Sequence, residues 1–371
     1  MKSLIPWSSF KVAILAILTT SIAVSTTGLY VISVSATLAR SLTLNTEGDI
    51  LIYSSVSRTP HTGLINNVVD RLAGVEGIIE LSPEVLTPIM INDNVIFLRG
   101  LNLTVLDRFI NYLLIGSLPR NDDEVLVGIR LSKYLNISVG QVLDIVSIPT
   151  SSRVNVTVSG VFKSSTPLDD EVVSSLSLSQ KLRGVNSNYV TLIRVKVSSP
   201  CIGSRCLSEI VDRSEGVNAP LKVVSKVLDN RSLGDVELVD EFLGRGISLS
   251  NTILWASMLL VLAISTSIIY FGTLWSMNTL APIVESLRSI GLSKVRLASI
   301  LILKILVLGT ASGVSAYLIS FLILNAIFTM MPVSIMLHKV EPVNDLRVLM
   351  TSTLLPSITA SMTIYLKIRE V

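Results

Sequence analysis

The sequence predicts a multi-pass membrane protein with four transmembrane α-helices and an α+β extracytoplasmic domain inserted between spans 1 and 2. Of its 371 residues, 50% are hydrophobic and only 15% are charged, whereas soluble globular chains carry about 25% charged residues. The mean hydropathy of +0.66 agrees with this. Four apolar runs each reach the roughly 20 residues that a helix needs to cross a bilayer.

The first apolar run, residues 12–36, follows Lys2 and Lys11 and therefore has the flanks of a signal peptide. Its apolar part is about 25 residues long, whereas the core of a signal peptide has about 7–15 residues. We therefore expect it to remain in the membrane as an uncleaved span. The other three spans are expected at 251–276, 297–327 and 348–366.

Residues 37–250 contain no run of membrane length and are expected to fold as one α+β domain. Short apolar segments alternate with turn signals, which is typical of strands. A helical pattern covers 64–75. The clearest strand-like segments are VIFLRG (95–100), VNVTVSGVF (154–162) and YVTLIRVKV (189–197).

The short segments on one side of the predicted spans are basic. The N-terminal segment 1–11, the connector 277–296 and the tail 367–371 all carry Lys or Arg. Because short cytoplasmic segments are enriched in these residues, we expect both termini in the cytoplasm. The 37–250 domain and the loop 328–347 then lie outside the cell (plasma) membrane.

The connector includes ESLRSIGLSKVRLASILILK (285–304), which predicts a helix, a turn at Gly291 and a second helix capped by Ser293. Apolar positions at Ile283, Leu287, Ile290 and Val295 form one stripe, with charges elsewhere. Two interpretations remain open. The segment either anchors the chain among lipid head groups or docks on a cytoplasmic partner.

The chain offers little for catalysis or for binding a metal or cofactor, so none of these is expected. It has only two histidines, and its two cysteines, Cys201 and Cys206, are too few for a zinc site of four thiolates. The two cysteines form either a small disulfide or two free thiols. The acidic cluster Asp169, Asp170 and Glu171 could suggest acid–base chemistry or a cation site, but a solvated loop explains it as well.

The predicted spans contain almost no ionisable residues apart from Lys304. An ion channel or proton-coupled transporter would need some, so these classes are disfavoured. Gly309 and Gly313 form a GxxxG pattern, which either allows close helix packing or reflects the general frequency of glycine in membrane helices.

Several motifs give the chain a resemblance to a known family. LRSIGLSKVRL (287–297) resembles the connector of FtsX-like permeases, the membrane subunits of ABC transporters that include MacB-type exporters and lipoprotein-release complexes. The layout of one span, a large outer domain and three further spans is similar too. Other segments that resemble family motifs are EVLVGIRLSKYLNISVGQVLDI (124–145), NVTVSGVF (155–162), SLSLSQKL (175–182) and KILVLGTASGVSA (304–316).

This resemblance implies that the connector is a coupling helix which contacts a cytoplasmic ABC ATPase. Arg288 and Arg296 would form ion pairs, and Leu287 and Ile290 would fill an apolar cleft. The chain has no G-x-x-x-x-G-K-[ST] phosphate loop, so it is not expected to be the enzyme itself. The expected contact residues are Glu285, Leu287, Arg288, Ile290, Gly291, Lys294 and Arg296.

The resemblance further implies a dimer with a second permease copy or paralogue, contact with membrane lipid and no nucleic-acid partner. Stalk helices at 36–44 and 237–251 would pass ATP-driven motion to the outer domain, which exports or extracts a hydrophobic or lipid-linked substrate. The alternative is a membrane-anchored extracytoplasmic sensor or regulator of envelope enzymes that performs no transport.

Overall fold

The computed structural model describes residues 10–44, 49–54, 64–65, 67–104, 112–198, 221–224, 248–335 and 337–370. They belong to two compact units. The helical unit comprises Met1–Val34, Thr252–Val333 and Val340–Val371. The α+β domain comprises Ser35–Asn251 together with the short segment Ser334–Lys339.

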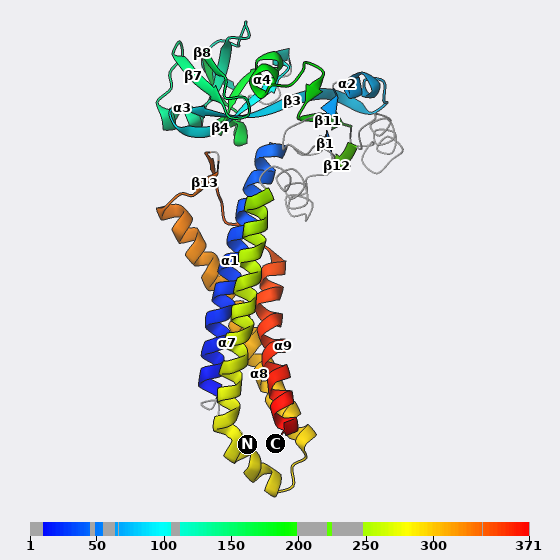
Figure 1. The fold of residues 1–371 in the computed structure, drawn as a ribbon, viewed down its shortest axis with the longest axis vertical. Helices are drawn as coiled ribbons and strands as arrows, with labels where there is room; N and C mark the ends of the chain where they lie inside the picture. The colour runs from blue at the N-terminus through cyan, green and yellow to red at the C-terminus, as the bar shows by residue number, and fades with distance from the viewer. Residues whose placement is uncertain are drawn as a thin grey trace. The chain divides into compact units, whose positions relative to one another are not determined.

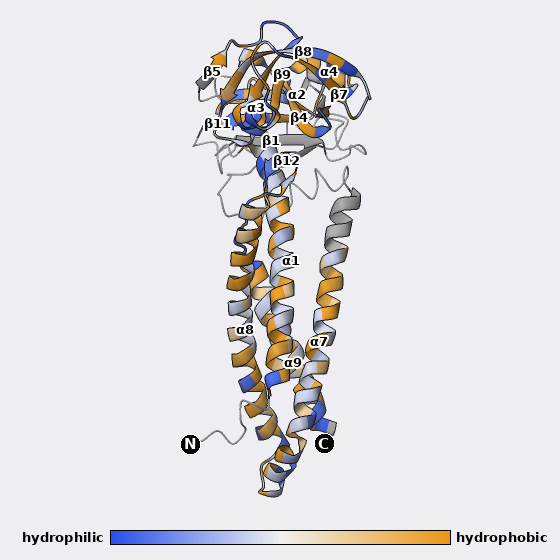
Figure 2. Ribbon diagram, turned by 90° about the vertical axis from the view of Figure 1, so that its left-hand side faces the viewer, coloured by the Kyte–Doolittle hydropathy of each residue, from blue (hydrophilic) through white to orange (hydrophobic). Residues whose placement is uncertain are grey.

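Four long helices carry the candidate membrane spans, as the apolar runs predict (Figure 1). Hydrophobic residues occur along all four helices (Figure 2). The longest has 42 residues and extends about 60 Å at 1.5 Å per residue, twice the thickness of the hydrocarbon core. The helices are α1 (Lys11–Thr43), α7 (Ser248–Ser289), α8 (Lys294–Met330) and α9 (Leu346–Glu370).

No break in the helix marks the expected boundary between the second span and the connector, because α7 continues to Ser289. The helix predicted in the connector is thus the end of α7. Pro282 lies inside it and removes one backbone hydrogen bond. Figure 1 shows the last turns of α7 bending away from the rest of the helix, which is the expected effect of an internal proline.

Small residues bring α8 and α9 close together. A Cβ added at Gly313 would lie 2.6 Å from Thr353 Cα, and one at Gly309 would collide with Ser357. A hydroxyl group also links α1 to α9, because Ser21 donates to the Ser352 carbonyl over 3.1 Å. Close backbone approach and such hydrogen bonds stabilise helix packing where the surrounding lipid is as apolar as the side chains.

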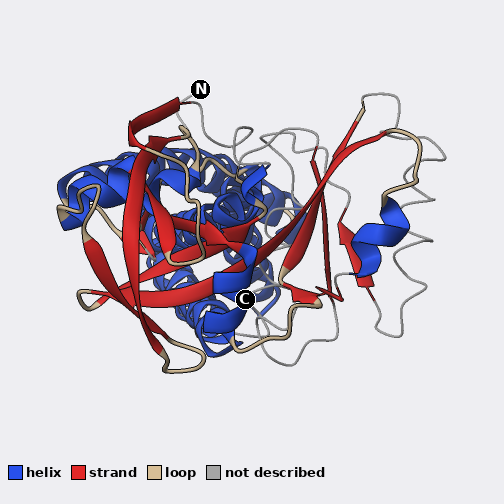
Figure 3. Cartoon of the chain, turned by 90° about the horizontal axis from the view of Figure 1, so that it is seen from above, coloured by secondary structure: helices blue, strands red, loops and turns tan. Residues whose placement is uncertain are grey.

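The α+β domain is built on a ten-stranded sheet, in which nine strands follow the order β12-β1-β11-β3-β4-β9-β6-β8-β5 and the tenth, β7, lies off this path. Its strands gather in two groups that long strands connect (Figure 3). The strands are β1 (Asp49–Ser54), β3 (Ile78–Ile91), β4 (Asn94–Leu101), β5 (Tyr112–Gly116), β6 (Glu124–Gly128), β7 (Val142–Ser147), β8 (Arg153–Lys163), β9 (Val172–Ser175), β11 (Leu192–Val197) and β12 (Leu221–Val224).

The strand β7 closes part of this sheet into a six-stranded ring, because it pairs with both β3 and β8. The ring runs β3-β4-β9-β6-β8-β7. Its apolar core also includes residues of α3 (Ile129–Leu135) and α4 (Leu176–Arg183). At 14 residues, β3 is long enough to continue from the ring to β11 and the second group of strands.

The three strands predicted from the sequence correspond to β4, β8 and the pair β10 (Tyr189–Val190) and β11. The helical pattern over 64–75 was only partly right. The structure has a strand, β2 (Leu64–Ile65), followed by a short helix, α2 (Asn67–Leu72). Of the predicted stalks, the first is the end of α1, whereas residues 237–247 lie outside the described residues.

Candidate functional site

The connector between α7 and α8 is a helix–turn–helix, with a tight turn at Gly291. The Gly291 amide donates to the Arg288 carbonyl over 2.9 Å, and the Leu292 amide donates to the Leu287 carbonyl over 3.2 Å. These are the two hydrogen bonds of a Schellman motif. Gly291 has φ = +98°, a left-handed conformation that favours glycine. Ser293 then caps α8 by accepting from the Arg296 amide over 3.4 Å.

The apolar stripe predicted on the connector is split between two environments. Leu287 is 8% exposed and packs in the core of the helical unit, as does Val284. Ile290 and Val295, by contrast, are 77% and 75% exposed. Of the two apolar residues expected to contact the ATPase, the structure thus places Leu287 in the core of the helical unit and Ile290 on the surface.

Charged groups surround the two exposed apolar side chains. Glu285, Lys294 and Arg296 are exposed and Arg288 is half-buried. We call the set Glu285, Arg288, Ile290, Lys294, Val295 and Arg296 the connector surface. Because an apolar centre with a mainly basic rim can bind an acidic, apolar cleft, this surface is suited to contact another protein.

A second feature of the helical unit is a cavity of about 420 Å³ between α7 and α9. Five hydroxyl side chains line it, and those of Thr266, Ser267, Thr359 and Thr363 each donate to a carbonyl of their own helix over 2.8–3.0 Å. The cavity walls thus offer apolar surface and no charge, which suits a hydrocarbon group. The lining residues are Thr266, Ser267, Tyr270, Phe271, Ile358, Thr359, Met362, Thr363 and Leu366.

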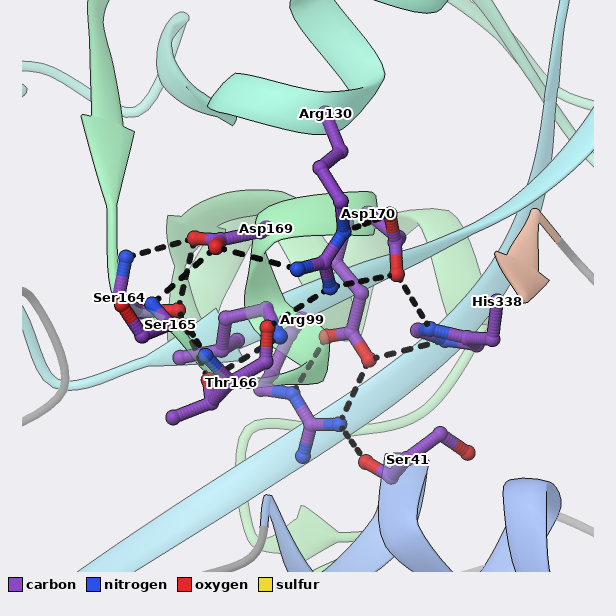
Figure 4. A network of polar contacts seen from close by, with 11 residues as sticks. Ser41, Arg99, Arg130, Ser164, Ser165, Thr166, Asp169, Asp170 and His338 are labelled. Carbon is purple, nitrogen blue, oxygen red and sulfur yellow. Dashed lines mark hydrogen bonds and ion pairs between the residues drawn. The ribbon is translucent and has the colours of Figure 1, made fainter. Parts of the chain in front are cut away.

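In the α+β domain, a buried cluster of charged side chains forms around Arg99 of β4 (Figure 4). Arg99 is fully buried and donates twice to Glu171, with Nε–Oε2 and Nη2–Oε1 distances of 2.7 and 2.9 Å. Its Nη1 donates to Glu84 over 2.6 Å, and its Nη2 donates to the Ser41 carbonyl over 2.6 Å. Ser41 lies in the last turn of α1, whose terminal carbonyls need such donors.

The acidic cluster continues through Asp169 and Asp170, in the short 3₁₀ helix η3 (Pro167–Asp170). Arg130 of α3 donates to Asp170 through Nε and Nη2 over 2.7 and 2.8 Å. Asp169 accepts from the amide of Ser164 over 2.6 Å. The expected solvated loop was therefore wrong: Asp169, Asp170 and Glu171 are all at least 93% buried, and each is paired.

His338 completes the cluster from a distant part of the sequence. It lies in a small hairpin, β13 (Ser334–Ile335) and β14 (His338–Lys339), between α8 and α9 along the chain. Its Nδ1 is 3.3 Å from Asp170 Oδ2, and its Nε2 is 3.5 Å from Glu171 Oε1. The ring is 3% exposed and lies beside Phe97, with ring centroids 6.2 Å apart.

The surroundings of His338 shift pKa values in opposite directions. Burial alone would lower the pKa of His338, but hydrogen bonds to Asp170 and Glu171 and their negative charges raise it above its ordinary value. Burial would raise the pKa of Asp170, yet hydrogen bonds from Arg130 and His338 lower it. The pKa of Glu171 is likewise lowered, chiefly by Arg99.

Sequence reasoning missed this cluster because its members are far apart in the chain. The expected contact residues of the connector do lie together, except for Leu287. Cys201 and Cys206 lie outside the described residues. Among the described residues, no group of three or more His, Cys, Asp or Glu side chains is arranged to hold a metal ion.

No protein-family model and no curated protein matches the sequence. Among solved structures, the periplasmic region of MacB from Actinobacillus actinomycetemcomitans aligns at 14% identity and a TM-score of 0.37, covering 48% of this chain and 88% of that one. The extracellular domain of the ABC-type transporter YknZ from Gram-positive bacteria aligns at 16% identity and a TM-score of 0.34, covering 47% and 99%. A permease domain from Porphyromonas gingivalis aligns at 13% identity and a TM-score of 0.31, covering 52% and 97%. Each of these matches covers about half of this chain.

Proposed function

We propose that this chain is the permease subunit of an ABC transporter of the FtsX, MacB and lipoprotein-release type. The observation that carries the proposal is the connector surface. Ile290 and Val295 are large apolar side chains exposed by about three-quarters, on either side of a rigid turn and next to basic groups. A plain link between two spans would need neither the exposed apolar pair nor the capped turn.

The division of labour follows from what the sequence contains. The chain has no phosphate loop, so ATP is bound and hydrolysed by a separate cytoplasmic ATPase that docks on the connector surface. Arg288 and Arg296 pair there with acidic groups, while Ile290 and Val295 enter an apolar cleft. Both termini lie in the cytoplasm, because the N-terminal segment, the connector and the tail are basic.

The permease works as a dimer with a second copy or a paralogue in the membrane. On α7, Leu260, Ile264 and Phe271 are among the large apolar side chains that are more than half exposed in the single chain. A partner permease and membrane lipid cover such a surface. ATP-driven motion of the connector passes through the long helices to the α+β domain.

The transported molecule is hydrophobic or linked to a lipid. The uncharged cavity between α7 and α9 supports this class, since most of its lining is apolar and four of its hydroxyl groups donate to their own helices. None of the lining side chains carries a charge that could pair with an ion. The α+β domain then exports the molecule or extracts it from the membrane.

The direct test is to purify the chain from its native membrane in mild detergent and to identify the proteins that accompany it. We expect an ATPase with a phosphate loop in about equal amount. The double variant Ile290→Asp with Val295→Asp should lose it, because two buried charges would face the cleft. Ile115→Asp is a matched control, as Ile115 is 65% exposed but lies on β5 of the α+β domain.

Loss of the ATPase only in the connector variant supports the proposal. Purification without any ATPase would overturn it and favour the alternative, a membrane-anchored sensor or regulator of envelope enzymes. Equal retention of the ATPase in both variants would show that docking uses another surface.

A further inference from the structure

We propose that His338 is a positioning residue that clasps the loop between α8 and α9 to the α+β domain when it carries a proton. The clasp provides a further attachment of the membrane helices to this domain, in addition to α1 and α7, which both continue from one unit into the other. That the clasp helps to transmit ATP-driven motion to the α+β domain rests on the proposed function. The clasp itself rests only on the contacts described below.

The hairpin that carries His338 belongs to the α+β domain, although it connects two helices of the helical unit. Residues Ser334–Lys339 group with the domain, while Val333 and Val340 on either side group with the helices. The segments that connect the hairpin to α8 and α9 are therefore very short. Any displacement of the hairpin relative to the domain must break the contacts of His338 and its neighbours.

Two side chains hold the hairpin. Leu337 packs against the apolar core of the strand ring, and His338 enters the polar cluster. Leu337 also has φ = +66°, a left-handed conformation that is unfavourable for a branched side chain. A turn of this kind persists only where its surroundings hold it in place, so the hairpin depends on these two contacts.

Charged groups from three other elements face the His338 ring. Asp170 of η3 and the adjacent Glu171 approach its two nitrogens directly. Arg130 of α3 and Arg99 of β4 lie behind these carboxylates and are bonded to them. Lys339 follows His338 on the hairpin itself but is exposed. Each ring nitrogen thus faces a carboxylate rather than a cation.

A neutral imidazole cannot satisfy this site. It carries one N–H, so only one of the two carboxylates can receive a hydrogen bond and the other nitrogen lone pair faces a negative charge. In the described structure Nε2 has no hydrogen-bond partner, although Glu171 lies 3.5 Å away. A protonated ring can donate from both nitrogens, so the hairpin is held more tightly in the protonated form.

The raised pKa of His338 gives the direction of the effect. The clasp is complete below the ordinary histidine pKa of about 6.5 and loosens as pH rises through the higher pKa of the folded state. In the proposed permease, alkaline conditions outside the cell would thus release the α8–α9 loop while α1 remains attached.

The test uses the full-length chain in nanodiscs and needs no ATPase. A negative result for the clasp is therefore distinguishable from a negative result for the proposed function. The chain has only two histidines, so His61→Gln leaves His338 as the only signal in a histidine-labelled NMR sample. We expect its titration midpoint above the ordinary value. A midpoint at or below that value would overturn the proposal. This measurement does not depend on any variant of His338 itself.

Hydrogen exchange of the hairpin, corrected for the intrinsic effect of pH, provides the second measurement. Protection of residues 334–339 should be at least tenfold higher at pH 6 than at pH 9 in the wild type, and should lose this dependence in His338→Gln. Lys339→Gln is the matched control and should keep the pH dependence of the wild type. Equal pH dependence in His338→Gln and wild type would contradict the clasp.

Discussion

The guanidinium group of Arg99 and the carboxylate of Glu171 form a two-fold hydrogen-bonded ion pair that is fully buried, with N–O distances of 2.7 and 2.9 Å. Burying one such charge without its partner is costly, so the pair is sensitive to the loss of either member. The same arginine also binds Glu84 and the Ser41 carbonyl. The pair therefore joins the strand ring to the last turn of α1.

Arg99→Met should destabilise the α+β domain by about 3–5 kcal/mol, because it leaves Glu171 and Glu84 buried without this partner. Amide hydrogen exchange in β4 and β9, measured on the full-length chain, should become faster by roughly two to three and a half orders of magnitude. Arg153→Met is the control. Arg153 forms only an exposed pair with Asp144 at 3.4 Å, so its loss should cost under about 1 kcal/mol. Equal effects of the two variants would contradict the assigned role of Arg99.

The second prediction concerns the packing of α8 against α9. Gly313→Leu should separate the two helices, because the added side chain would meet the Thr353 backbone in a closely packed contact. We expect a loss of about 1–3 kcal/mol in the stability of the helical unit. This is measurable as a lower midpoint of thermal unfolding in detergent.

Ala311→Leu is the matched control for this prediction. Ala311 lies on the same helix but is exposed, so a larger apolar side chain there should change the midpoint little. If Gly313→Leu were equally harmless, the glycine would be a common membrane-helix residue without a packing role, as the other interpretation of the sequence pattern holds.

The sequence predicts the spans well, because an apolar run of membrane length is a local signal. It also predicts the turn at Gly291, where a glycine follows the last helical residues and a serine precedes the next helix. It fails where the answer depends on contacts between distant segments. Leu287 looks like Ile290 in the pattern, but only the packing of the four helices decides which of the two is buried.

The acidic cluster shows the same limit more clearly. Asp169, Asp170 and Glu171 look like a solvated loop in isolation, since three adjacent carboxylates repel one another. Their partners come from β4, α3 and a hairpin more than 160 residues further along the chain. One residue in the sequence could have indicated that this cluster is buried: Gly128, in the segment 124–145 that resembles a family motif. A Cβ there would collide with the Asp169 backbone, so the glycine marks close packing of η3.

The third prediction concerns the turn of the connector. Gly291→Ala places a side chain at φ = +98°, which costs about 1–2 kcal/mol for an L-residue. No neighbouring atom would be displaced, so the cost is confined to the turn. Capture of the ATPase should weaken by roughly five- to thirty-fold, if docking requires this conformation.

Gly140→Ala is the control for the connector, because Gly140 also has a positive φ of +84° and open space around it, but lies in the α+β domain. It should strain the backbone to a similar degree and leave ATPase capture unchanged. The same loss of capture in both variants would mean that general destabilisation, and not the connector turn, controls docking.

The fourth prediction is the pH dependence of the stability of the α+β domain. The pKa values of Asp170 and Glu171 are lowered in the folded state, so their contribution is present above the ordinary carboxyl pKa of about 4 and is lost as pH falls through the lowered values. The pKa of His338 is raised. Its contribution is complete below about pH 6.5 and is lost as pH rises through the raised value. Stability should thus be greatest between about pH 4.5 and 6.5.

Urea unfolding of the full-length chain, followed by brief proteolysis of the α+β domain, measures this profile directly. His338→Gln should remove the decline on the alkaline side and leave the acid side in place, because the carboxylates keep Arg99 and Arg130 as partners. Asp144→Asn is a suitable control, since this exposed carboxylate lies in the same domain. An alkaline decline that persists unchanged in His338→Gln would assign it to another group.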